Sequence, residues 1–187
     1  MVNLTKGHGV NLKKEAPNLK RILIGLGWDP IRCFLSNFDI DASVLCINKK
    51  EKCKELVFYG NLHDSSGAIR HFGDNLTGEG DGDDEQIEIN LDKLPKKIVK
   101  IMIIINIYEA YKRKQHFGKV KNCYVHVRDM DSGKELVRYD VDDDYNKKTG
   151  IFVAELNRDE LGEWRFNAIG EGVKVKNIKE MVNLKCK

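Results

Sequence analysis

One short stretch, residues 73–85, combines many acidic side chains with closely spaced glycines. Between Asp74 and Glu85 the chain holds six carboxylates and no lysine, arginine or histidine. Two carboxylates about 4 Å apart repel each other by roughly 4 kcal/mol near a protein surface. A chain that folds this stretch must therefore leave the charges in water or supply a cation that neutralises them.

The glycines in this stretch favour a bound cation over charges that are left in water. Gly78, Gly80 and Gly82 allow the backbone to take positive φ angles and to turn its carbonyl groups inward. Carboxylates and carbonyls together form the oxygen shell that Ca²⁺ prefers, with six to eight ligands. We therefore predict a calcium site, and a solvated acidic hairpin loop is the alternative. The candidate ligands here are the side chains of Asp74, Asn75, Asp81, Asp83, Asp84 and Glu85 and the carbonyls of Gly78 and Gly80.

The predicted site is not an EF-hand. Counted from Asp74, an EF-hand needs Asp or Asn at positions three and five and glycine at position six. Leu76, Gly78 and Glu79 occupy those positions. Residues 86–91 alternate polar and apolar side chains, which predicts a strand where an EF-hand has a helix. The stretch also lacks the lysine of a phosphate-binding loop, and no tandem repeat supports a calcium-binding β-helix.

A second acidic element precedes another predicted strand, in the sequence Asp39-Ile40-Asp41-Ala42-Ser43. Residues two apart on a strand point to the same face, so Asp39 and Asp41 share a face and Ile40 points to the core. Taken alone, such a pair is typical of a solvated strand edge.

These two elements together resemble the TerD family of bacterial tellurium-resistance and general-stress proteins. The thirteen-residue acidic stretch with Asp39-Ile40-Asp41-Ala42-Ser43 is the specific part of the resemblance, which extends over nearly the whole chain. Weaker matches are residues 2–7 with 10–12, 25–29, 115–120 with Asn122, and Tyr139-Asp140. Departures occur at Pro30, Cys33 and Phe34, and at Tyr108-Glu109, where many members have His-Asp.

The resemblance implies a calcium-binding β-sandwich with a role in resistance to chemical stress, acting with other stress or tellurium-resistance proteins. It also implies that Asp39 and Asp41 meet the acidic stretch across one end of the sandwich. At least eight oxygen donors are then available, so two calcium ions are feasible, whereas Mg²⁺ and soft metals suit this donor set less well. Whether Glu109 is a further ligand stays open.

The periodicity of the chain predicts a mainly β fold, an antiparallel β-sandwich with one or two short helices, as a single domain over residues 1–187. The predicted helices are residues 109–115 and 174–184. The predicted strands are residues 21–26, 40–47, 55–59, 68–72, 86–91, 97–108, 123–128, 135–141, 151–156 and 164–169, with 97–108 buried on both faces.

Composition constrains the cellular location of the protein and the chemistry of its cysteines. The chain of 187 residues has 41% hydrophobic and 33% charged residues, no apolar signal-peptide core and no apolar run of membrane-spanning length. Its five cysteines are scattered, so we expect no disulfide framework or structural zinc site, and we expect Cys46 and Cys123 to be buried and inert. These features favour a cytoplasmic protein without an integral membrane segment.

The remaining polar residues carry no recognisable catalytic pattern. Lysine clusters lie on a chain with net charge +3, but no aromatic side chains interleave with them, so we expect no nucleic-acid partner. His-Glu-x-x-His and Gly-x-Ser-x-Gly motifs are absent, and we interpret His71 as a surface histidine at a strand end. The favoured hypothesis is a non-enzymatic calcium-binding protein. The alternatives are a metal-dependent hydrolase or phosphoryl-transfer enzyme, and a calcium-bridged small-molecule binder.

Overall fold

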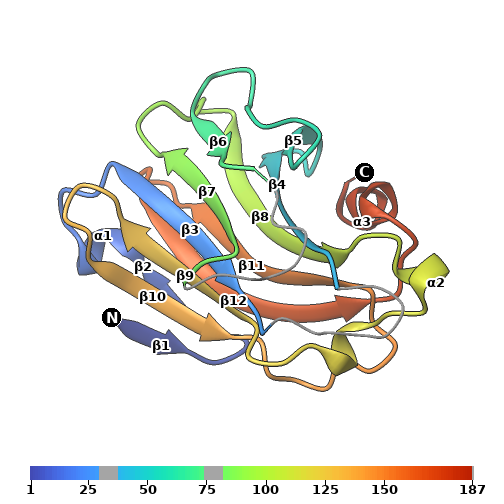
Figure 1. The fold of residues 1–187 in the computed structure, drawn as a ribbon. Coiled ribbons are helices and arrows are strands. Elements are labelled where there is room, and N and C mark those ends of the chain that lie inside the picture. The colour runs from blue at the N-terminus through green and yellow to red at the C-terminus, as the bar shows by residue number, and fades with distance from the viewer. Residues whose placement is uncertain (30–37, 74–81, 187) are drawn as a thin grey trace.

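Two six-stranded sheets face each other in the computed structural model, which describes residues 1–29, 38–73 and 82–186 (Figure 1). The first sheet has the strand order β1-β10-β9-β3-β7-β6. Its strands are β1 (Val2–Leu4), β3 (Arg21–Gly27), β6 (Ile69–His71), β7 (Glu85–Asn90), β9 (Tyr124–Asp129) and β10 (Glu135–Asp140). The second sheet has the order β2-β12-β11-β8-β4-β5. Its strands are β2 (Gly9–Asn11), β4 (Ile40–Asn48), β5 (Cys53–Val57), β8 (Ile98–Ile107), β11 (Gly150–Arg158) and β12 (Trp164–Val173).

The mainly β sandwich that the sequence predicts is confirmed. Every predicted strand overlaps an observed one, and the pairing is antiparallel except between β1 and β10, which run parallel. Strands β1 and β2 were not predicted, because each has only three residues and three residues show no period. They are strands because their backbones pair with β10 and β12, which their side-chain pattern does not indicate.

The main core lies between the two sheets. Side chains such as Ile24 and Ile87 of the first sheet and Ile103 of the second are fully buried there. Alternate side chains of β8, including Met102 and Ile104, belong to a second apolar cluster on the other face of the second sheet. Strand β8 is therefore buried on both faces, as its long and mostly apolar sequence predicts.

In the described part of the chain, short helices connect or cover the sheets: α1 (Leu12–Glu15), α2 (Ala110–Arg113), the 3₁₀ helix η1 (Phe117–Lys119) and α3 (Ile178–Lys185). Both predicted helical regions contain a helix, α2 and α3. The Asn177 side chain accepts from Glu180 N–H and so caps α3. Within the described ranges, no helix is long and apolar enough to cross a membrane.

The cysteines depart from expectation in one respect. Cys53 and Cys186 form a disulfide between β5 and the end of α3, with 5.4 Å between their Cα atoms. The two cysteines are 133 positions apart in sequence, so no local pattern reveals this contact. They come together because α3 folds onto the second sheet. Cys46 and Cys123 are free and buried, as predicted, and Cys33 lies outside the described residues.

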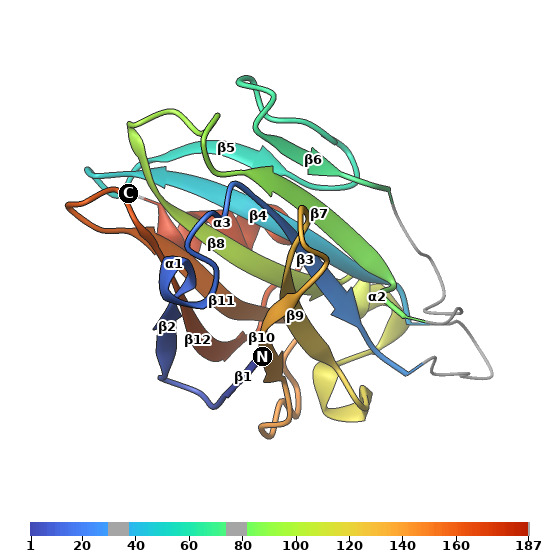
Figure 2. The ribbon, with the colours of Figure 1, turned by 90° about the vertical axis from the view of Figure 1, so that its left-hand side faces the viewer.

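One end of the sandwich collects the acidic motifs. Strand β3 ends there, and β7 and β9 begin there, since Leu26 pairs with Glu85 and Gly27 with Tyr124. In the second sheet the start of β4 pairs with the end of β8, through Ile40 and Ile107. Figure 2 shows the ends of these strands on the side where α2 lies. We call this the acidic end of the sandwich.

Candidate functional site

The predicted ligands divide between described and undescribed parts of the chain. Asp39, Asp41, Asp83, Asp84 and Glu85 are described, and all lie at the acidic end. Asp74, Asn75, Gly78, Gly80 and Asp81 lie outside the described residues. The geometry below therefore concerns the carboxylates that flank the acidic stretch.

Asp41 is a buried carboxylate on β4 that faces a neutral amide. It is 2% exposed, and its Oδ2 accepts a hydrogen bond of 2.8 Å from Asn106 Nδ2. The two residues are register partners on β4 and β8, so the sheet itself fixes their contact. Removing a carboxylate from water is costly unless charge and hydrogen bonds compensate. The Asn106 amide supplies one of the hydrogen bonds that compensate the Asp41 carboxylate.

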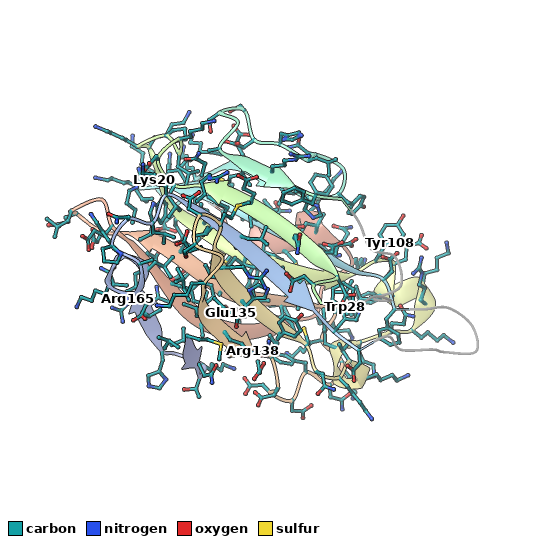
Figure 3. The ribbon with its side chains drawn as sticks, turned by 60° about the vertical axis from the view of Figure 1, so that its left-hand side comes forward. Lys20, Trp28, Tyr108, Glu135, Arg138 and Arg165 are labelled. Atoms are coloured by element: carbon teal, nitrogen blue, oxygen red, sulfur yellow. A yellow bond between two sulfur atoms is a disulfide. The ribbon has the colours of Figure 1, made fainter. Side chains whose placement is uncertain are left out.

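Asp39 lies two residues before Asp41, directly ahead of β4, and contacts a cation of the protein. Its carbonyl accepts from Tyr108 N–H at 2.8 Å, and its carboxylate lies 3.6 Å from Arg113 Nη1. Arg113 Nε also lies 3.8 Å from Glu109, which in turn is 3.2 Å from Lys112 Nζ. Glu109 is thus paired with two cations of α2 in this structure. Figure 3 shows Tyr108 and Trp28 at the acidic end.

Glu85 joins the two sheets. Its side chain starts on β7 of the first sheet and is 1% exposed, and its Oε2 accepts from the Ala42 N–H on β4 at 2.6 Å. The last residue of the acidic stretch is therefore hydrogen-bonded to the Asp39-Ile40-Asp41-Ala42-Ser43 element. This contact brings the two predicted motifs together, which no local pattern could reveal.

His71 completes the same contact, and our interpretation of it as a surface histidine was wrong. The residue is 1% exposed, because the alternation along β6 turns Ile69 and His71 inward and Arg70 outward. Its Nδ1 accepts from Gly73 N–H at 3.1 Å, so the ring proton is on Nε2. That N–H faces the Ala42 carbonyl at 3.1 Å and Glu85 Oε2 at 3.4 Å.

Asp84 binds the backbone at the end of β3. Its Oδ2 accepts from Trp28 N–H at 2.8 Å, and its own N–H donates to the Leu26 carbonyl at 2.8 Å. Burial raises the pKa of the Asp84 carboxyl, the Trp28 hydrogen bond opposes this rise, and the charge of Asp83 adds to it. Such a carboxylate gains from a neighbouring positive charge.

Asp83 points to the outer face of the first sheet and is held there by side chains. Its Oδ1 lies 2.7 Å from His126 Nε2 and 3.2 Å from the Tyr124 hydroxyl, and its Oδ2 accepts from Gln86 Nε2 at 3.0 Å. Burial alone would raise the pKa of Asp83, but the hydrogen bond and charge of His126, with the bonds from Gln86 and Tyr124, lower it overall. The same environment raises the pKa of Tyr124 to about 12, through burial and the charge of Asp83.

Gly25 explains how this carboxylate reaches the sheet. The residue lies on β3 between its partners Gln86 and His126, and a Cβ at this position would overlap both the Asp83 carboxylate and the His126 ring. Gly27 likewise leaves room for the Tyr124 ring. Because Gly25 and Gly27 have no side chains, the side chains of Asp83, His126 and Tyr124 pack directly against the backbone of β3.

The donor set fits a hard cation, although the described residues do not complete a site. Several carboxylates gather at the acidic end with a buried amide and backbone groups, and oxygen donors are those that Ca²⁺ prefers. Within residues 1–29, 38–73 and 82–186, no group of three or more His, Cys, Asp or Glu side chains could by itself hold a metal ion. A site here requires oxygens from residues 74–81 as well.

Sequence reasoning missed several residues of this end. Asn106, His126, Trp28 and Arg113 all contact predicted ligands. Only Trp28 lies in a motif that the sequence singled out. The other three come from distant strands or from α2, and their contacts depend on register and packing.

Comparison with known families identifies the chain. The family model described as TerD domain matches residues 1–184. The chain belongs to the TerD family. The resemblance drawn from the acidic stretch and the Asp39-Ile40-Asp41-Ala42-Ser43 element is therefore confirmed.

Individual TerD-family relatives span most of the chain. Stress response protein SCP2 of Bacillus subtilis (strain 168) is 38% identical over 195 residues, covering 97% of this chain and 98% of that protein. Tellurium resistance protein TerD of Serratia marcescens is 41% identical over 174 residues, covering 91% and 90%. A crystal structure of a homologue of telluride resistance protein (TerD) from Streptomyces coelicolor A3(2) has a TM-score of 0.71 at 23% identity. It covers 88% of this chain and 98% of that chain, and it supports the fold.

Proposed function

We propose that this TerD-family protein is a non-enzymatic, calcium-binding stress-response protein. Calcium neutralises the acidic stretch and orders it against the acidic end of the sandwich. The ordered end is then an interaction surface for other stress or tellurium-resistance proteins. The names of its relatives, a stress response protein and a tellurium resistance protein, support the cellular role.

The hydrogen bond between Glu85 and Ala42 carries this proposal. It joins the last residue of the acidic stretch to the Asp39-Ile40-Asp41-Ala42-Ser43 element, so the oxygens of both motifs are available at one place. Asp41 and Glu85 are buried and accept hydrogen bonds from neutral groups, the Asn106 amide and the Ala42 N–H. A cation next to these buried carboxylates would stabilise their charges.

Asp39, Asp41, Asp84 and Glu85 would hold the metal, together with oxygens of the predicted ligands among residues 74–81. Asp83 stays a predicted ligand, although its carboxylate already interacts with His126, Tyr124 and Gln86. When bound, calcium would supply positive charge and fixed coordination, and these select one conformation of the acidic stretch.

Calorimetric titration of the metal-free protein with CaCl₂ tests the proposal. We expect about one to two ions bound per chain, within the ligand capacity of these oxygens. An Asp84→Asn variant should bind more weakly. A Glu160→Gln variant should bind like the wild type, because Glu160 is exposed in the turn between β11 and β12, away from the acidic end. Fewer than about half an ion per chain would refute the proposed calcium function.

A further inference from the structure

The outer face of the second sheet carries a separate apolar cluster beneath α3. Its fully buried members come from β4, β8, β11, the segment after β12, and α3 itself. They are Leu45, Ile47, Met102, Ile104, Phe152, Val175 and Met181, and we call them the outer apolar cluster. Figure 1 shows α3 on the side of the second sheet that faces away from the first sheet. The helix is therefore the cover of this cluster.

Helix α3 is held by few contacts of its own. It has eight residues, a length at which an isolated helix is marginal in water. Met181 is its one fully buried residue, packed over Gly150, while Ile178 and Val182 are partly buried. Outside the apolar contacts, Lys185 Nζ lies 2.6 Å from Glu171 and 4.4 Å from the centroid of the Phe152 ring.

The Cys53–Cys186 disulfide ties this helix to the sheet. Cys186 follows directly after α3, and Cys53 is the first residue of β5, the edge strand of the second sheet. The bond joins positions 133 apart in sequence, and while it is intact it keeps the end of the helix close to the sheet. A covalent tether of this kind makes the docking of α3 intramolecular and raises its effective concentration at the sheet.

The two cysteines of the disulfide differ from the other described cysteines in accessibility. Cys53 and Cys186 are partly exposed at the rim of the outer apolar cluster. Cys46 and Cys123 are buried, and burial raises the pKa of each thiol to about 12. Because the thiolate is the reactive form, the rim pair is, among the four described cysteines, the one placed for exchange with a small reagent.

We propose that Cys53 and Cys186 form a reversible, redox-sensitive tether that controls how tightly α3 covers the outer apolar cluster. The oxidant is a low-molecular-weight disulfide. One protein thiolate attacks it, forming a mixed disulfide and releasing one small thiol. The second protein thiolate attacks the protein sulfur of that mixed disulfide, forming the Cys53–Cys186 bond and releasing a second small thiol. In total the two cysteines lose two electrons and two protons, and the small disulfide gains them.

Reduction reverses these two steps and leaves α3 held by non-covalent contacts alone. The helix should then separate from the sheet more often and expose Met102, Ile104 and Phe152 together. This inference does not depend on calcium, since the tether and the acidic end use different residues.

The first measurement follows the bond itself. The protein is equilibrated in oxidised and reduced glutathione, free thiols are alkylated under native conditions, and the labelled peptides are identified by mass spectrometry. We expect Cys53 and Cys186 to be labelled together in reduced glutathione and protected together in oxidised glutathione, with Cys46 and Cys123 unlabelled in both. Free thiols at both rim cysteines in excess oxidised glutathione would overturn the proposal.

The second measurement follows the helix by amide hydrogen exchange. Exchange of the α3 amides should rise by about tenfold or more on reduction, while the amides of β8 stay protected. The variants Cys53→Ser and Cys186→Ser should each resemble the reduced wild type and should not respond to reductant. Equal protection of α3 in oxidised and reduced wild-type protein would refute the tether, whether or not the variants fold.

Discussion

At the scale of single residues, Gly25 shows how one missing side chain organises the acidic end. Its bare backbone lets the Asp83 carboxylate, from the segment before β7, and the His126 ring, from β9, approach β3 closely. The sequence marks Gly25 only as part of a short motif. The register of β7 and β9 shows why the position holds glycine, since a side chain there would overlap Asp83 and His126.

Replacing Gly25 should therefore be costly. A Gly25→Ala variant forces its Cβ against Asp83 and His126, and we expect a loss of about 1–3 kcal/mol in the free energy of unfolding. Urea denaturation measures this loss. In a His126→Ala background the added cost of Gly25→Ala should be smaller, because one of the two overlapping groups is gone. A Gly25→Ala variant as stable as the wild type would contradict the predicted overlap.

The buried thiols make a second prediction at this scale. Burial raises the pKa of Cys46 and Cys123 to about 12, so at pH 8 both are almost entirely protonated and unreactive. In the folded protein, iodoacetamide should leave both unlabelled over a period that labels a small free thiol completely. Unfolding in guanidinium chloride should make both reactive. Rapid labelling of either cysteine in the folded protein would show that it is accessible.

At the scale of elements, the contact between β7 and β4 links the two sheets through one side chain. Glu85 reaches from the first sheet to the Ala42 N–H of the second, with His71 of β6 beside it. Neighbouring Glu88 also lies on β7, but it faces the other side and lies 3.8 Å from Arg21. The two glutamates therefore form a matched pair for mutation.

A Glu85→Ala variant should lose about 1–3 kcal/mol in the free energy of unfolding, because the buried Ala42 N–H then lacks its acceptor. A Glu88→Ala variant should stay within about 0.5 kcal/mol of the wild type, because its ion pair is partly exposed. Both are measured by urea denaturation with a calcium chelator present, which separates the hydrogen bond from metal binding. Equal losses of unfolding free energy in the two variants would contradict the role of the Glu85 hydrogen bond in joining the two sheets.

Some strands and motifs could be predicted from the sequence, whereas most contacts between distant parts of the chain could not. Strands with a long alternating or continuous apolar pattern, such as β7 and β8, could be predicted because their burial repeats along the chain. The three-residue strand β1 could not, since its place depends on backbone pairing with β10. The acidic motifs could be recognised by composition, but the partners Asn106 and His126 are separated from them by long stretches of chain. The disulfide was missed for the same reason.

At the scale of the whole molecule, the proposed calcium site predicts that metal and stability are coupled. A ligand that binds only the folded state at a hundredfold excess over its Kd stabilises it by about 2.7 kcal/mol. For a chain of 187 residues this corresponds to roughly 5 to 10 °C in melting temperature. Differential scanning calorimetry with and without a chelator measures the shift. An unchanged melting temperature on chelation would count against the proposed site.

Strand β8 has a consequence for how the protein can diverge. The side chains that it turns toward the first sheet include β-branched Ile101, Ile103 and Ile105, whereas the side it turns toward α3 combines Ile104 with Met102, which lies in one cluster with Met181. Isoleucine has few rotamers and fits a fixed shape, while methionine adapts to altered neighbours. Substitutions that accumulate over evolution should therefore be accepted more readily beneath the helix than between the sheets.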